Sequence, residues 1–167
     1  GMDLALRITE KLPETTVARR LTVCRFLVVA SPDYLRQHGE PRHPDELARH
    51  ACLAYSLASR SSWQFLIDGE LHPVEIGGSL TANNANVLLE AALRGMGIAY
   101  QPTFVVADAI RQGTLVPVLK GFQTPQLDMC AVFPGTRFVP QRVRSFVDFL
   151  ASRLGPEPYW DRGLSLE

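Results

Sequence analysis

The chain has 167 residues, enough for one domain of ordinary size or two small lobes with a buried core. Apolar residues make up 46% of the chain and charged residues 20%, which excludes a disordered or fibrous protein. Lysine plus arginine and aspartate plus glutamate number 17 each, so the chain lacks the basic excess that draws a protein to nucleic acid.

Short apolar runs alternate with segments of helical period, the pattern of a mixed α/β protein. Up to residue 75 the pattern predicts, in chain order, a buried strand at 3–8, a stronger strand at 22–30, a helix at 32–38, a short helix at 44–50, a strand at 51–56 and a hairpin with strands at 63–67 and 70–75. Ser31 is the expected N-cap of the first helix, and Gly39 its stop. Asp68-Gly69 is the expected tight turn of the hairpin, and Pro73 places its second strand at a sheet edge.

Helices and strands continue to alternate after the hairpin. The predicted elements are, in order, a helix that follows Asn83-Asn84, a strand at 98–100, a helix that ends at Gly113, strands at 115–119 and 127–133, and a helix at 141–154. Apolar stripes are predicted on the first and last of these helices, formed by Val87, Leu88, Ala91 and Ala92 and by Val143, Phe146, Val147 and Leu150. The tail after residue 155 is expected to be loose apart from Tyr159 and Trp160.

The residues that usually carry chemistry are scattered. Cys24, Cys52 and Cys130 are an odd number and widely spaced, which favours neither a disulfide framework nor a zinc site. No histidine has metal-ligand spacing to another candidate ligand, and no Gly-x-Ser-x-Gly elbow occurs. We therefore expect no metal, no cofactor and no catalytic residue.

The sequence contains no stretch near the ~20 apolar residues that a membrane-spanning helix needs. Its first residues also lack the charged and hydrophobic layout of a signal peptide. We expect a cytoplasmic protein that makes no contact with a membrane.

Four stretches of the chain, in this order, resemble the effector-binding domain of LysR-type transcription regulators. They are residues 3–8 with 18–21 and 29–39; residues 41–50; the hairpin of Trp63-Gln-Phe and Asp68-Gly69; and residues 80–102, which end in Gly-Met-Gly-Ile-Ala-Tyr-Gln-Pro, with 113–119 after them. Each stretch alone is a weak signal. The set is specific and covers almost the whole chain up to about residue 154.

The resemblance implies a type 2 periplasmic-binding-protein-like fold, with two α/β lobes and a central cleft that holds the effector. Carried onto this chain, it assigns residues 31–132 to the second lobe, residues 1–30 and 133–154 to an incomplete first lobe, and residues 155–167 to a C-terminal tail. It also implies that the opening strand and helix of the first lobe and the winged helix-turn-helix lie outside this sequence.

The implied function is to sense a small-molecule effector, such as a carboxylate or an aromatic acid, and to relay its binding to a DNA-binding head. DNA would then be contacted through that head and not through this chain, and the family forms homodimers. Two alternatives stay open. One is a free-standing solute-binding protein of the same fold, and the other is a module whose exposed sheet edge serves dimerisation alone.

The candidate ligand residues lie where predicted strands end, because open α/β lobes bind ligands beyond the carboxyl ends of their strands, near helix N-termini. In the turn from Thr81 to Asn84, the side chains of Asn83 and Asn84 either cap the next helix or contact a ligand. Arg7, at the end of the first predicted strand, is either a surface residue or a partner for a carboxylate. The remaining candidates are the strand-end residues Tyr55, Ser56, Gln101 and Pro102.

Overall fold

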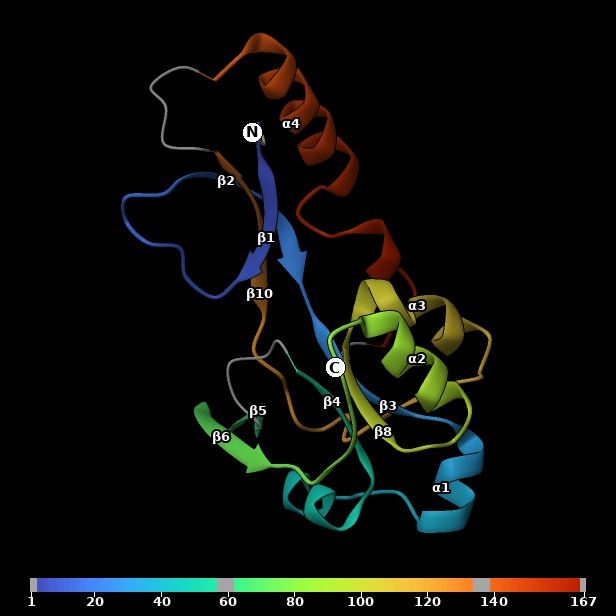
Figure 1. Cartoon of the computed structure of the whole chain (residues 1–167). Helices are drawn as coiled ribbons and strands as arrows, with labels where there is room; N and C mark the ends of the chain where they lie inside the picture. Colours follow the sequence, from blue (N-terminus) through green and yellow to red (C-terminus); the bar gives the residue numbers. More distant parts are fainter. Residues whose placement is uncertain (1–2, 57–61, 134–138, 166–167) are drawn as a thin grey trace. The chain divides into compact units, whose positions relative to one another are not determined.

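The computed structural model describes residues 3–56, 62–133 and 139–165 (Figure 1). The internal contacts of the chain divide it into two compact units. Unit 1 consists of Gly1–Arg25 and Gln126–Arg162, and unit 2 of Phe26–Pro125 and Gly163–Glu167.

This division differs from the lobes predicted from the sequence, which placed the two crossings after residues 30 and 132. The structure places them earlier, after Arg25 and after Pro125. The physical reason is that the single strand predicted at 22–30 is two strands, which meet at Arg25 and pair in different sheets. Of the predicted ranges, residues 1–2, 57–61, 134–138 and 166–167 lie outside the described part of the chain.

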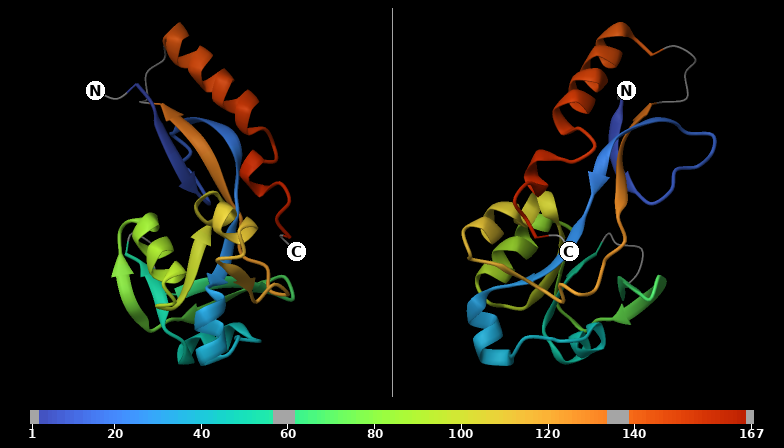
Figure 2. Two further views of the ribbon diagram at one scale, coloured as in Figure 1. Left: turned by 90° about the vertical axis from the view of Figure 1, so that its right-hand side faces the viewer. Right: turned by 180° about the vertical axis from the view of Figure 1, so that it is seen from behind.

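Unit 1 is a three-stranded antiparallel sheet with a helix packed on it. The strands are, in spatial order, β1 (Ala5–Thr9), β10 (Leu127–Phe133) and β2 (Val17–Cys24). Helix α4 (Gln141–Leu154) runs beside this sheet in both views of Figure 2. It buries Val143 and Val147 against Leu21 of β2 and Ala131 of β10.

The strand predicted as buried at 3–8 is β1, and that prediction of burial is wrong. Leu6 is 52% exposed and Ile8 38% exposed. The reason is the position of β1 at the edge of the sheet: Leu6 pairs with Ala131 and so shares the face that α4 covers, but α4 packs on the opposite edge strand, β2.

The tail after α4 is ordered at Tyr159 and Trp160, the two residues that the prediction excepted, and also at Asp161. These three residues form a short 3₁₀ helix, η2 (Tyr159–Asp161). Asp161 is buried, and one of its carboxylate oxygens accepts a hydrogen bond from the Arg25 guanidinium at 2.7 Å. This ion pair ties the tail to the end of β2, a long-range contact that local sequence pattern does not reveal.

Unit 2 is built on a five-stranded mixed sheet. In spatial order the strands are β7 (Gly78–Ala82), β4 (Cys52–Tyr55), β8 (Ile98–Pro102), β3 (Phe26–Ala30) and β9 (Val116–Val118). Strand β4 is parallel to β7 and β8, and β3 is antiparallel to both of its neighbours. Neighbouring residues such as Val28 and Val29 belong to different hydrophobic clusters, so both faces of the sheet are covered.

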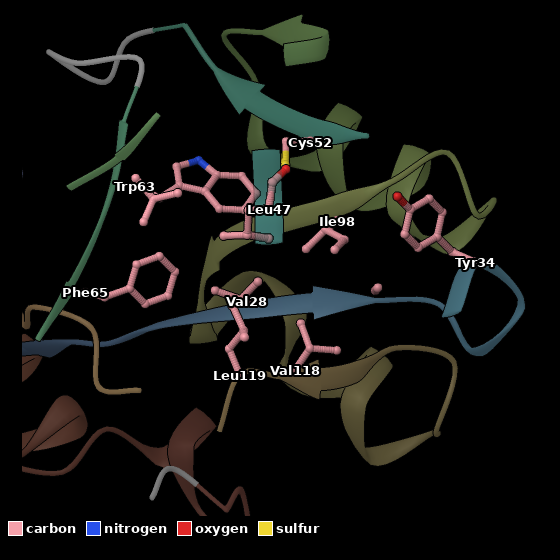
Figure 3. Close-up of a cluster of buried hydrophobic side chains, with 11 residues drawn as sticks. Val28, Tyr34, Leu47, Cys52, Trp63, Phe65, Ile98, Val118 and Leu119 are labelled. Atoms are coloured by element: carbon pink, nitrogen blue, oxygen red, sulfur yellow. The ribbon is translucent and has the colours of Figure 1, made fainter. Parts of the chain in front are cut away.

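One face carries the cluster in Figure 3, where Trp63 and Phe65 lie near Val28 and Leu47. The elements on this face are α1 (Pro32–His38), the 3₁₀ helix η1 (Pro44–Arg49) and the hairpin of β5 (Ser62–Ile67) and β6 (Glu70–Glu75).

The caps and turns predicted for this region are confirmed. Ser31 Oγ accepts a hydrogen bond from the backbone N–H of Tyr34 at 3.2 Å, and Gly39 ends α1 with φ 81°. Asp68 and Gly69 have φ values of 53° and 82°, as a tight hairpin turn with two left-handed residues requires.

The other face is covered by α2 (Ala85–Leu93) and α3 (Thr103–Arg111). Leu88, Ala91 and Ala92 are buried as predicted, but Val87 on α2 is 49% exposed, and so is Phe146 on α4. Both stand one residue, or about 100° of helix rotation, from a buried neighbour, so the predicted stripes were too wide.

Within the described residues, no helix is both long enough and apolar enough to span a membrane.

Candidate functional site

The carboxyl ends of three parallel strands, β7, β4 and β8, lie at one edge of the sheet in unit 2. Tyr55 at the end of β4 pairs with Ala82 at the end of β7. The next residue extends the pairing, because the Ser56 N–H donates to the Ala82 carbonyl at 2.9 Å. Tyr55 and Ser56 are both exposed and lie beside the turn at Asn83-Asn84.

The turn after β7 is a helix cap, as one of its two interpretations predicted. Asn84 is the N-cap of α2, and its side-chain oxygen accepts a hydrogen bond from the Asn86 N–H at 2.9 Å. Asn83 and Thr81 are exposed next to it. The side-chain oxygen of Asn84 is therefore engaged in the fold, whereas Thr81 and Asn83 present polar groups to the outside.

Two buried polar side chains flank Pro102, the residue at which β8 ends and α3 begins. Pro102 is the N-cap residue of α3 and supplies no side-chain hydrogen bond to its first turn. Gln101 is 1% exposed and Thr103 fully buried. Within the described residues, Gln101 Oε1 and Thr103 Oγ1 are buried atoms with no hydrogen-bond partner. Thr103 was missed from the sequence, although a polar residue directly after a strand-ending proline was a usable signal.

Strands β4 and β8 pair over a short stretch. Their register joins Cys52 to Ile98 and Leu53 to Ala99, and both strands then continue, β4 to Tyr55 and β8 to Pro102. The last residues of β4 and β8 are therefore outside their shared register, at the carboxyl ends of parallel strands, which is the usual place for a ligand in an open α/β sheet.

Exposed apolar side chains stand at these strand ends or in the helix turns that follow them. Tyr55 is 39% exposed, Val87 in the first turn of α2 is 49% exposed, and Phe104 in the first turn of α3 is 40% exposed. The sequence pattern had placed Val87 in the core. The same strand ends and the turns after them also carry the polar side chains of Thr81, Asn83, Gln101 and Thr103. Apolar and polar groups at one end of a sheet suit a small molecule that has one polar end.

Arg7 belongs to unit 1 and not to this edge. It lies in the middle of β1, paired with Cys130, and is exposed; its predicted place at a strand end is wrong, because β1 continues to Thr9. A role for Arg7 in ligand binding stays a prediction. The candidate residues that the structure brings together are all in unit 2.

The cysteines show no sign of reactivity. All three are buried free thiols. Burial, with a contribution from the Asp161 charge, raises the pKa of Cys24 to about 12, and burial raises the pKa of Cys52 to about 12. Burial also raises the pKa of Cys130. In the part of the chain that the structure describes, no group of three or more histidine, cysteine, aspartate or glutamate residues could hold a metal ion.

Comparisons with known proteins agree with this architecture. Residues 1–155 match the family model of the LysR substrate binding domain. The chain is 35% identical over 155 residues to the HTH-type transcriptional regulator CrgA of Neisseria meningitidis serogroup C, covering 92% of this chain and 52% of that protein. It is 34% identical over 159 residues to the HTH-type transcriptional regulator PtxR of Pseudomonas aeruginosa, covering 95% and 51%. The chain thus spans about half the length of the curated relatives it matches.

Solved structures give the same result. The regulatory domain of CrgA from Neisseria meningitidis superposes with a TM-score of 0.80 at 37% identity, covering 92% of this chain and 76% of that domain. The full-length virulence activator AphB of Vibrio cholerae superposes with a TM-score of 0.78 at 28% identity, covering 90% and 51%.

Proposed function

This chain belongs to the LysR substrate-binding domain family, and we propose that its effector binds at the carboxyl edge of the unit 2 sheet. The predicted family and its type 2 periplasmic-binding-protein-like fold are confirmed by the matches. The chain is an effector-binding domain of a LysR-type regulator, and the solute-binding alternative is not favoured, because the matched relatives are named as transcriptional regulators.

The proposed effector is a small aromatic or apolar carboxylate. The observation that carries this choice is the start of α3, where the first backbone N–H groups receive no side-chain cap and the buried Gln101 and Thr103 stand beside them. Helix N-termini favour anions through their partial positive charge and free N–H groups. The exposed apolar side chains of Tyr55, Val87 and Phe104 at the same strand ends support an apolar body for the ligand.

In the complete regulator, effector binding would favour one conformation of the sensor over another, and a homodimer would pass this bias to the DNA-binding heads. The proposed sensing function requires ligand binding and a conformational change and no covalent chemistry. We assign DNA contact to another part of the regulator, because this chain has equal numbers of basic and acidic residues and so no net basic excess. We place the protein in the cytoplasm, where such a regulator meets both metabolite and DNA.

A ligand screen tests the proposed site. Benzoate, phenylacetate and a short aliphatic carboxylate are titrated into the isotopically labelled chain, with benzamide as the uncharged match for benzoate. We expect the carboxylates to shift the backbone amide resonances of Phe104 and Val105 and benzamide to shift them much less, because the helix N-terminus selects the negative charge.

Two variants locate the binding. Phe104→Ala removes one of these exposed apolar side chains and is expected to weaken benzoate binding roughly tenfold. The control, Gln37→Ala, changes an exposed residue of α1 and should leave the affinity unchanged. Shifts confined to other parts of unit 2, or equal affinity for benzamide, would show that the site or the ligand class is wrong.

A further inference from the structure

The Tyr34 hydroxyl links α1 to the start of β4. Tyr34 is 2% exposed. Its hydroxyl oxygen accepts a hydrogen bond from the Ala51 N–H at 3.0 Å and lies 3.1 Å from Nδ1 of His50. One side chain of α1 therefore holds two consecutive residues that lead into β4.

The hydrogen bonds of the Tyr34 hydroxyl are best satisfied by one protonation state of His50. Since the Ala51 N–H can only donate, the tyrosine oxygen is the acceptor there, and its own proton is free for the second bond. The tyrosine proton has a partner in this contact when His50 Nδ1 accepts it, which requires an imidazole unprotonated at Nδ1. In this arrangement His50 is neutral and carries its proton on Nε2.

The surroundings of His50 act against its protonation. The groups that face it are His38 and Tyr34 from α1 and Glu46 from η1. Burial lowers the pKa of His50 below its ordinary value of 6.5, the His38 charge lowers it further, and Glu46 opposes this shift. His38 is itself fixed near Tyr34, because its ring stacks on the tyrosine ring at 4.4 Å and its Nδ1 lies 3.1 Å from the Tyr34 carbonyl.

Ala51 is an anchor between α1 and the central sheet. Its carbonyl accepts a hydrogen bond from the Ile98 N–H at 2.8 Å, at the start of β8. A Cβ atom on Gly97 would lie 2.4 Å from the same carbonyl oxygen, so the backbones meet closely here. Any loosening of Ala51 therefore reaches two neighbouring strands of the sheet.

We propose that Tyr34 and His50 form an acid-released latch, in which a proton from solvent binds His50 Nδ1, removes the acceptor of the tyrosine hydroxyl and detaches α1 from the start of β4. The tyrosine proton then has no acceptor at a buried position, which destabilises the closed form. This inference goes beyond effector sensing and does not depend on where the effector binds.

The sign of the pH dependence follows from the lowered pKa of His50. Above the ordinary value of 6.5, the imidazole is neutral in both the closed and the open form, and the latch contributes its full stability. As the pH falls from 6.5 through the lower pKa of the closed form, the open form takes up the proton first and the contribution is lost.

The opposite end of η1 supplies an internal control. There His72 Nε2 lies 2.8 Å from a carboxylate oxygen of Asp45, and His43 Nδ1 lies 3.3 Å from the other. The His72 hydrogen bond lowers the pKa of Asp45. A proton on His72 strengthens this pair instead of breaking it, so acid does not release the hairpin from η1.

Amide hydrogen exchange of the 167-residue chain tests the latch. After correction for intrinsic rates, we expect exchange at Ala51 to become about tenfold faster between about pH 7.5 and about pH 5, with a midpoint that matches the titration of the His50 ring by NMR. The Ser56 amide, at the other end of β4, is bonded to Ala82 and should show no such change.

Three variants separate the latch from a general acid effect. His50→Asn keeps an acceptor that does not titrate, so Ala51 should stay protected at low pH, whereas His72→Gln should keep the wild-type pH response. Tyr34→Phe should expose Ala51 at every pH. The proposal would be overturned if amide exchange at Ala51 in the wild type did not depend on pH, or if the His50 ring titrated at or above 6.5. Neither of these measurements needs a variant. A pH response that persisted in His50→Asn would also overturn the proposal.

Discussion

The two units bury their sheets to different degrees. In unit 2, hydrophobic clusters cover both faces of a five-stranded sheet, and neighbouring residues such as Leu53 and Cys52 face opposite cores. In unit 1, the described residues place α4 over the β2 side of a three-stranded sheet and leave Leu6 and Ile8 of β1 largely exposed. Unit 2 thus has the layers of a complete α/β domain, whereas unit 1 depends on fewer, more specific contacts.

The contrast between the two units predicts that hydrophobic layering determines the stability of unit 2 and that individual ion pairs matter more in unit 1. The two tryptophans allow each unit to be followed separately, because Trp63 lies in unit 2 and Trp160 in unit 1.

The largest effect is expected in the core of unit 2. Phe65 is fully buried in the cluster of Figure 3, so Phe65→Ala should lower the free energy of unfolding of unit 2 by about 4 kcal/mol. This loss of stability is measured by urea unfolding in a Trp160→Phe background, with Trp63 fluorescence as the signal. Leu71→Ala on the same hairpin is the control, because Leu71 is 57% exposed, and should cost less than about 0.5 kcal/mol. Similar losses in the two variants would contradict the layered core.

In unit 1 the buried ion pair between Arg25 and Asp161 should be the sensitive point. Their side chains are 22% and 5% exposed, and Asp161→Ala would leave the guanidinium without this partner. We expect unit 1 to lose about 3 kcal/mol, seen by Trp160 fluorescence in a Trp63→Phe background. Asp148→Ala breaks the exposed pair with Arg19 and should cost at most about 0.5 kcal/mol. Equal costs would show that burial does not distinguish the two pairs.

The sequence predicts local structure well where the signal is local. Ser31 and Gly39 bound α1, and Asp68-Gly69 sets the hairpin turn, because capping and left-handed backbone geometry depend on a few adjacent residues. Burial is harder to predict. Leu6 and Phe146 look like core residues, yet their exposure depends on which strand α4 packs against, and this is a long-range property.

The candidate site was predicted only in part, because some of its features are local in sequence and others depend on tertiary structure. Tyr55, Ser56 and the Asn83-Asn84 turn meet because β4 and β7 are parallel, and the sequence pointed to them by their place at the ends of predicted strands. The absence of a side-chain cap at the start of α3 and the burial of Thr103 depend on how β8 enters the helix, and no pattern in the sequence reports that geometry.

A smaller effect is expected where two backbones of unit 2 meet. In Gly97→Ala the new methyl group would lie 2.4 Å from the Ala51 carbonyl oxygen, so β4 and β8 must separate slightly, at a cost of about 2 kcal/mol. Gly77→Ala is the matched control, since nothing lies within 4 Å of its Cβ position, and it should change stability by less than about 0.5 kcal/mol. Thermal unfolding of both variants measures this difference in stability. If Gly97→Ala is as stable as the control, the close approach has no energetic weight.

The smallest effect on stability, and the largest on solution behaviour, is expected at the exposed apolar surface of unit 1, formed by Leu6, Ile8, Phe146 and Phe149. On α4, helix rotation places Phe146 and Phe149 on the flank opposite Asp148, which pairs with Arg19 of β2. The same flank carries Arg142, whose guanidinium lies 3.4 Å from the carboxylate of Asp3, just before β1. The two phenylalanines therefore stand on the side of α4 nearer to β1, where Leu6 shares the covered face of the sheet.

Exposed apolar side chains gathered on one side of a unit favour association between copies of a chain. Phe149→Lys, at a residue 57% exposed, should change the free energy of unfolding by less than about 0.5 kcal/mol and shift sedimentation at high concentration toward the monomer. Val87→Lys, at an apolar residue of unit 2 with 49% exposure, is the matched control and should leave the association unchanged. If both lysine variants dissociate equally, the added net charge is responsible. If neither variant dissociates, the exposed apolar surface of unit 1 is not a contact between copies of the chain.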